Sequence, residues 1–172
     1  MELYIRLVAL LSRICGVAAA GMVLVSVVIV CQMVFLRYVL AESVIWQTEF
    51  VTYMLITATL VGSPYVLLLR GHVNVDLLPQ YLGHRGRFAL AIIASVLALT
   101  FCLVVAWTGY EQWYEAWEGG WHSDTMWGPR LWIPYLAMPV GFGILSLQYI
   151  ADIMSLATGR DMPFGISQGA GE

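Results

Sequence analysis

Four stretches of this chain contain no Asp, Glu, Arg, Lys or His, and each is long enough to cross a lipid bilayer as a helix. They cover residues 14–36, 50–69, 88–110 and 131–151 and are 20 to 23 residues long. A helix rises about 1.5 Å per residue and the bilayer core is about 30 Å thick, so about 20 apolar residues span it. Backbone in contact with lipid must satisfy its own hydrogen bonds, which favours helices. The sequence therefore predicts an all-α fold, an integral membrane four-helix bundle in a single membrane domain of residues 1–172.

The scarcity of charged side chains also indicates a membrane environment. Of 172 residues, 60% are hydrophobic, and only 8 basic and 11 acidic side chains are present. A soluble domain is about one quarter charged, so this composition excludes an ordinary soluble fold. The formal net charge of −3 gives no basic surface for nucleic acid. We expect membrane lipid around the chain and no nucleic-acid partner.

The arginines predict how the spans are oriented. An even number of spans puts both ends of the chain on one side, together with the connection between the second and third spans. That side holds Arg6, Arg13, Arg70, Arg85, Arg87 and Arg160, and the other side holds Arg37 and Arg130. By the positive-inside rule this distribution predicts cytoplasmic N- and C-termini. The opposite, outer side collects most acidic residues and all seven tryptophans.

The spans contain nothing that would move an ion or a proton. Such proteins usually place an ionisable group near the bilayer midplane. Here the interior of the spans offers isolated hydroxyls, which usually bond to carbonyls of their own helix; they are Ser26, Thr57, Thr59, Ser95 and Thr100. The histidines lie outside the spans, which argues against haem, and the three cysteines lack zinc-ligand spacing. We expect no catalytic site, no cofactor and no metal.

Three polar segments each admit more than one interpretation. After the first span, Arg37 either extends toward the lipid headgroups or forms an ion pair with Glu42 or Glu49. The inner connection, residues 70–87, is either a short interfacial helix or a turn flanked by basic residues.

The third segment extends the third span outward. Glu111, Glu115 and Glu118 share one helical face there. They form either a solvated acidic face or a periplasmic docking patch for a soluble partner. The neighbouring tryptophans also allow an aromatic cage for a quaternary ammonium ligand, which is the weakest of these interpretations.

Several residues together resemble a known family, the DctQ-type small membrane subunit of TRAP (tripartite ATP-independent periplasmic) transporters. An Arg-Tyr pair ends the first span, a Trp and an acid precede the second, and an Arg-Gly-His-x-x-Val-Asp-like signature follows it. These are Arg37, Tyr38, Trp46, Glu49, Arg70, Gly71, His72, Val75 and Asp76, with Gly62 in the second span and Pro139, Gly141, Leu147 and Gln148 in the fourth. One departure is Thr48, where the family often has an acid.

The resemblance implies a role in the bacterial inner membrane. A periplasmic solute-binding protein of such a transporter captures an organic acid, and a large TRAP membrane subunit carries it inward on a cation gradient. The small subunit is implied to be a non-catalytic scaffold for the large one. The implied structural or subunit-contact positions are Arg37, Trp46, Glu49, Arg70, His72 and Asp76.

Two alternatives remain open on the sequence. The first is a membrane-anchor subunit of a respiratory or other membrane enzyme complex. The second is a small homo-oligomeric exporter, which would have to work without any ionisable group in its spans.

Overall fold

The computed structural model describes residues 2–69 and 84–157, and its regular elements there are all helices. They are α1 (Glu2–Val39), α2 (Gln47–Leu68), α4 (His84–Glu118), α5 (Trp132–Tyr135) and α6 (Ala137–Ala157). In these ranges the one β-type contact is an isolated bridge between His122 and Arg130. The predicted all-α fold is confirmed. The proposed interfacial helix between spans two and three lies outside the described residues.

All four predicted spans coincide with helices long and apolar enough to cross a membrane. These candidate spans are Leu3–Val39, Gln47–Leu68, Leu90–Glu118 and Trp132–Ser155. The helices around the first and third runs extend well past the uncharged residues, because polar side chains can continue a helix beyond the hydrocarbon. The fourth run is divided at Leu136 into α5 and α6, where Pro134 and Pro139 each remove a backbone donor.

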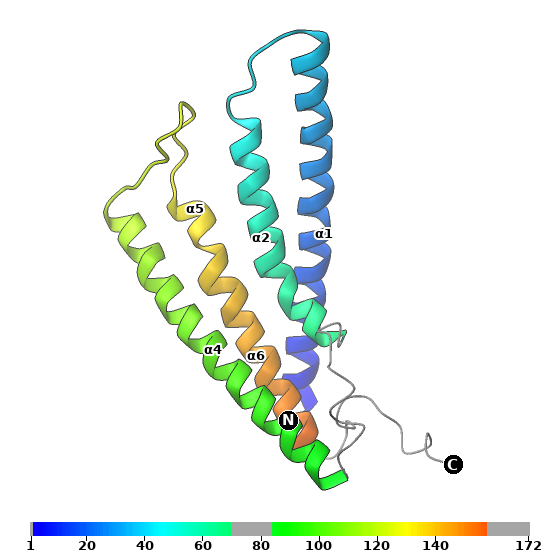
Figure 1. The fold of residues 1–172 in the computed structure, drawn as a ribbon. Coiled ribbons are helices and arrows are strands. Elements are labelled where there is room, and N and C mark those ends of the chain that lie inside the picture. The colour runs from blue at the N-terminus through cyan, green and yellow to red at the C-terminus, as the bar shows by residue number, and fades with distance from the viewer. Residues whose placement is uncertain (1, 70–83, 158–172) are drawn as a thin grey trace.

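The helices pack as a row in the order α1, α2, α6, α4 (Figure 1). Among the described residues α4 packs on α6 and α5 and makes no comparable contact with α1 or α2. The row therefore does not close into a ring. A soluble bundle would have to cover the faces left open, but in lipid an apolar face needs no protein partner.

The helices of the row have an outer end and an inner end, which hold different parts of the chain. The outer end holds the α1–α2 connection and the α4–α5 connection, residues 119–131, called the outer loop below. The inner end holds the start of α1 and the end of α6, so both ends of the described chain lie on the same side, as an even number of spans requires (Figure 1). Which membrane side each end faces stays a prediction.

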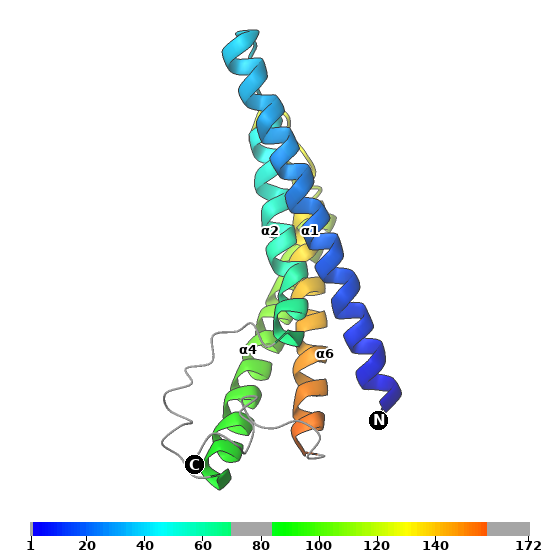
Figure 2. The same cartoon turned by 90° about the vertical axis from the view of Figure 1, so that its right-hand side faces the viewer.

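Helices α1 and α2 run antiparallel in a constant register. A Cβ on Gly16 would overlap the ring of Tyr65, a Cβ on Gly62 would lie 3.1 Å from that of Ala19, and the Thr48 hydroxyl reaches the Met33 sulfur at 3.5 Å. Continuing this register places Leu68, the last residue of α2, opposite Arg13. Residues 2–12 of α1 therefore project past the inner end of α2. In Figure 2 this part of α1 diverges from the other helices.

Small side chains line the face of α1 that packs against the row. The buried positions alternate at four- and three-residue spacing, and they are Val8, Ser12, Cys15, Ala19 and Ser26. Spacing of this kind keeps one narrow stripe of a helix facing its neighbour, and small residues let the backbones approach closely.

Helices α2 and α6 approach each other closely at Leu60, one turn before Pro64. Pro64 has no N–H to give the carbonyl oxygen of Leu60, and the hydroxyl of Ser63 bonds to that oxygen instead, at 2.8 Å. Gly141 of α6 faces the same carbonyl, because a Cβ on Gly141 would lie 2.6 Å from the oxygen. The Cα–H that glycine has in place of a Cβ therefore points at the Leu60 carbonyl oxygen, which Pro64 leaves without a backbone N–H donor, a weak but recurrent type of helix–helix contact.

Candidate functional site

The described residues do not gather into a metal or redox centre. No group of three or more His, Cys, Asp or Glu side chains in residues 2–69 and 84–157 could hold a metal ion, and the cysteines there are free. The polar contacts between different elements lie instead near the inner and outer ends of the helices.

At the outer end, Glu49 joins α2 to the outer loop. Its Oε1 accepts a hydrogen bond from the Tyr53 hydroxyl at 2.6 Å, one helical turn along α2. Its Oε2 accepts a bond from the Thr125 hydroxyl at 2.5 Å, across 76 residues of sequence. Hydrogen bonds to a carboxylate are about twice as strong as neutral ones. Both carboxylate oxygens of Glu49 are therefore engaged within this chain.

Three aromatic rings pack beside this contact. Trp46, which precedes α2, lies 5.9 Å from Phe50 and 6.2 Å from Trp127 between ring centroids, and Phe50 lies 6.3 Å from Trp127. Edge and tilted arrangements at these distances are favourable for aromatic pairs. Trp46 thus packs the outer loop against the start of α2. Its side chain is 38% exposed.

Arg37 stands apart from this cluster. Its side chain is exposed on the last turn of α1, and no ion pair joins it to Glu42 or Glu49 among the described residues. The carboxylate of Glu49 is already engaged by two hydroxyls. This placement agrees with the interpretation of Arg37 as an arginine that extends outward, and it leaves the guanidinium accessible.

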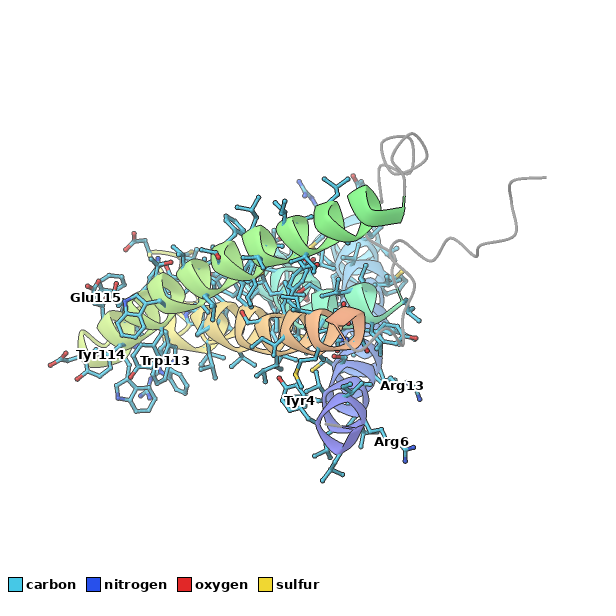
Figure 3. All side chains as sticks on the ribbon, turned by 90° about the horizontal axis from the view of Figure 1, so that it is seen from below. Tyr4, Arg6, Arg13, Trp113, Tyr114 and Glu115 are labelled. Atoms are coloured by element: carbon cyan, nitrogen blue, oxygen red, sulfur yellow. The ribbon has the colours of Figure 1, made fainter. Side chains whose placement is uncertain are left out.

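The three glutamates of α4 lie exposed near its outer end. Glu111, Glu115 and Glu118 are all solvent-accessible, and Glu111 accepts a hydrogen bond from the Trp107 indole at 2.9 Å. Figure 3 shows Glu115 at this end of α4, together with Trp113 and Tyr114. The shared acidic face expected from the spacing is present.

Aromatic rings form a ladder behind these acids. Tyr110 lies 5.8 Å from Trp113, Trp113 lies 5.9 Å from Trp117, and Trp117 meets Trp132 of α5 edge-on at 4.7 Å. The rings pack on one another and tie α4 to α5. An apolar ring with a polar N–H or O–H suits a membrane–water interface.

Three further candidates, Arg70, His72 and Asp76, lie outside the described residues. Their roles as structural or contact positions stay predictions.

Near the inner end, a hydrogen-bonded chain that the sequence analysis missed joins α1 to α6. The hydroxyl of Ser12 donates to Gln148 Oε1 at 2.9 Å, and Gln148 Nε2 donates to Asp152 at 3.1 Å. Ser12 is fully buried and Gln148 is 3% exposed. The Tyr4 hydroxyl also reaches the Leu147 carbonyl, at 3.3 Å. The signal that could have revealed Ser12 is its place in the regular stripe of small residues on α1.

Hydroxyls inside the spans bond to their own helices, as predicted for three of them. Ser26 donates to the Met22 carbonyl, Thr59 to that of Leu55 and Thr100 to that of Val96, at 2.8 to 2.9 Å. The donor hydrogens of these hydroxyls are therefore used within their own helices.

Comparison with known families gives one match that covers most of the chain. Residues 26–159 match the family model described as tripartite ATP-independent periplasmic transporters, DctQ component. The matched range begins inside α1 and reaches past the end of α6.

Two curated relatives point the same way. The chain is 24% identical over 148 residues to the C4-dicarboxylate TRAP transporter small permease protein DctQ of Vibrio cholerae serotype O1, an alignment covering 74% of this chain and 64% of that protein. It is 25% identical over 140 residues to the isethionate TRAP transporter permease protein DctMQ of Oleidesulfovibrio alaskensis, covering 78% of this chain and 22% of that protein. The chain thus spans under two thirds of the length of either relative.

Proposed function

This chain belongs to the DctQ component family of tripartite ATP-independent periplasmic transporters, and we propose that it is the small, non-catalytic permease subunit of such a transporter for organic acids. It is a multi-pass protein of the bacterial inner membrane. The observation that carries the proposal is the family match over residues 26–159, which includes three of the four candidate spans and the outer part of the first. The single membrane domain expected from the sequence is part of this proposal.

The substrate class rests on the relatives' names. C4-dicarboxylates and isethionate, which appear in the two names, are both organic anions. Transport is secondary-active in this proposal, driven by a cation gradient that acts through another subunit. The interior of the spans supports assigning transport elsewhere, because hydroxyls such as Ser26 and Thr100 are bonded to their own helices.

We assign the chain a scaffolding role for a large membrane subunit. In the Oleidesulfovibrio alaskensis protein the stretch that matches this chain is 22% of a much longer permease polypeptide named DctMQ, which supports a large partner for the separate chain. The open row of helices leaves wide apolar faces on α1 and α4 for lipid and for that partner; Leu24, Val28, Leu97, Phe101 and Val104 are exposed on these faces. The accessible guanidinium of Arg37 is a candidate contact at the outer end.

The second proposed partner is a periplasmic solute-binding protein that docks at the outer end. The acidic face of Glu111, Glu115 and Glu118 supports this, because exposed charges of one sign accelerate and orient association with a partner of opposite charge. The aromatic ladder beneath it holds that face on the bundle.

Co-purification tests the scaffolding role. The full chain, tagged and expressed in its own cells, is extracted in mild detergent and analysed by mass spectrometry. We expect a much larger multi-span protein in the same complex, and loss of organic-acid uptake when the chain is deleted. A tagged chain that purifies alone, with uptake unchanged in the deletion strain, would contradict the proposal.

Charge reversal tests the docking role. The triple variant Glu111→Lys, Glu115→Lys, Glu118→Lys should weaken uptake at limiting binding protein, while the complex with the large subunit stays intact. The matched control is Arg130→Glu, a reversal in the outer loop away from the acidic face. Equal uptake by the triple variant and the parent protein would refute docking at these residues and leave the scaffolding role untouched.

A further inference from the structure

Helix α1 extends further at its inner end than a membrane span requires. Helix α1 is 38 residues long, which at about 1.5 Å per residue is about 57 Å, nearly twice the thickness of the bilayer core. Its register with α2 places Arg13 level with the inner end of α2. Residues 2–12 therefore form an overhang of about three turns, called the inner overhang here.

The inner overhang crosses α6 rather than following it. Tyr4 and Ser12 are two turns apart on α1, yet their hydroxyls reach the adjacent residues Leu147 and Gln148 of α6. The start of α1 is therefore held at an angle to α6, and it projects to one side of the inner end (Figure 2).

Two different surfaces remain free on this segment, and each continues onto one of the next two residues, Arg13 and Ile14. Leu3, Leu7, Leu10 and Ile14 recur at four- and three-residue spacing, and each is more than half exposed. Arg6 and Arg13 are seven residues apart and exposed, and neither has an ion-pair or hydrogen-bond partner among the described residues. Helical periodicity places the two arginines on one face, about a quarter turn from the leucine stripe.

Figure 3, seen from the inner end, shows Arg6 and Arg13 extending from the same side of α1, whereas Tyr4 lies on another side of the helix. Both guanidinium groups therefore point away from the α6 contact. An apolar stripe beside a basic stripe, at the end of a spanning helix that is held at an angle to its neighbours, suits the boundary between acyl chains and lipid headgroups.

We propose that the inner overhang is a binding site for anionic phospholipid headgroups. The leucine stripe lies among the upper acyl chains, and Arg6 and Arg13 bind the phosphates of adjacent lipids. Charge complementarity selects the occupant, because a planar guanidinium pairs bidentately with a phosphate, and the apolar stripe beside it needs the acyl chains that a free phosphate lacks. The hydrogen bonds of Tyr4 and Ser12 to α6 fix the angle at which the segment meets the interface.

The test measures lipid binding by the purified full chain. Native mass spectrometry and thermal unfolding follow titration with phosphatidylglycerol, with phosphatidylcholine as the uncharged reference. We expect preferential binding of phosphatidylglycerol, and a weakening of roughly fivefold for each of Arg6→Gln and Arg13→Gln. Arg130→Gln, an equal charge change at the outer end, should bind as the parent does. Inorganic phosphate should not displace the lipid.

Three results would overturn the proposal. The first is equal phosphatidylglycerol binding by Arg6→Gln, Arg13→Gln and the parent protein. The second is displacement of the lipid by inorganic phosphate. The third is efficient disulfide cross-linking of Leu7→Cys in native membranes, either to a second copy or to another protein, because that would show the stripe occupied by protein. All three readouts are independent of transport.

Discussion

Ser12 of α1 donates a hydrogen bond to the side-chain oxygen of Gln148 of α6 at 2.9 Å, and both residues are almost completely buried. A buried amide oxygen without a donor loses its hydration and receives nothing in return. This bond therefore fixes where α1 crosses α6, and with it the position of the inner overhang.

We predict that Ser12→Ala lowers the free energy of unfolding by about 1 kcal/mol, the range found for hydrogen bonds between membrane helices. Unfolding by sodium dodecyl sulfate in mixed micelles measures it. The control is Ser26→Ala. Ser26 is also buried on α1, but its hydroxyl donates to the backbone carbonyl of Met22 in the same helix. The two variants should differ, and equal losses would show that the Ser12–Gln148 bond contributes nothing specific.

The contact between Gly141 and Leu60 gives a second prediction. A Cβ on Gly141 would lie 2.6 Å from the Leu60 carbonyl oxygen, so Gly141→Ala must push α6 away from α2. We expect a loss of about 1 to 3 kcal/mol in unfolding free energy, as for overpacked cores. Gly143→Ala, two residues along α6, meets no atom within 4 Å and should be neutral or stabilising, since alanine favours a helix.

The measurement is again unfolding in mixed micelles, supported by cross-linking between α2 and α6. If Gly141→Ala were as stable as Gly143→Ala, the close approach at the Leu60 carbonyl would have to be absent in the membrane.

Topology gives a third prediction, which comes from the distribution of arginines. A green fluorescent protein fused to the C-terminus should fluoresce, because it folds in the cytoplasm. Alkaline phosphatase inserted after Asp124 in the outer loop should be active, because it requires the periplasm. The opposite pair of results would show that the predicted membrane orientation is wrong and that the acidic face of α4 lies inside the cell.

The spans could be predicted because uncharged runs of 20 or more residues have one solution in a bilayer. The pairing of the helices could not be predicted from hydropathy, because a lipid-facing side and a protein-facing side are equally apolar. The spacing of Ser12, Cys15 and Ala19 did carry that information, since small residues mark close approach. The division of the fourth run at Leu136 lies between Pro134 and Pro139, each of which removes a backbone donor from the helix.

The candidate residues were predictable only in part. Glu49 was singled out by resemblance, and the structure adds its partner Thr125, which no periodic pattern connects to it across 76 residues. The exposed acids of α4 followed directly from helical spacing. Among the described residues Arg37 forms no ion pair with Glu42 or Glu49, and hydroxyl groups engage both oxygens of Glu49.

The fourth prediction concerns the bond between Thr125 and Glu49. The outer loop is held to α2 by this bond and by the packing of Trp127 on Trp46 and Phe50. This bond joins the loop to a carboxylate on α2, so Thr125→Val should make opening of the loop several times more frequent. Amide hydrogen exchange of Ser123, Gly128 and Leu131 reports it, because their N–H groups are bonded within the loop and to its ends.

The matched control is Thr52→Val, whose hydroxyl bonds to the Thr48 carbonyl in its own helix. It should leave exchange in the outer loop unchanged. Glu49→Ala should raise exchange further than Thr125→Val, because it also removes the acceptor of Tyr53. If exchange stayed at the parent rate in both Thr125→Val and Glu49→Ala, the aromatic rings alone would hold the loop, and Glu49 would be released for a contact with another subunit.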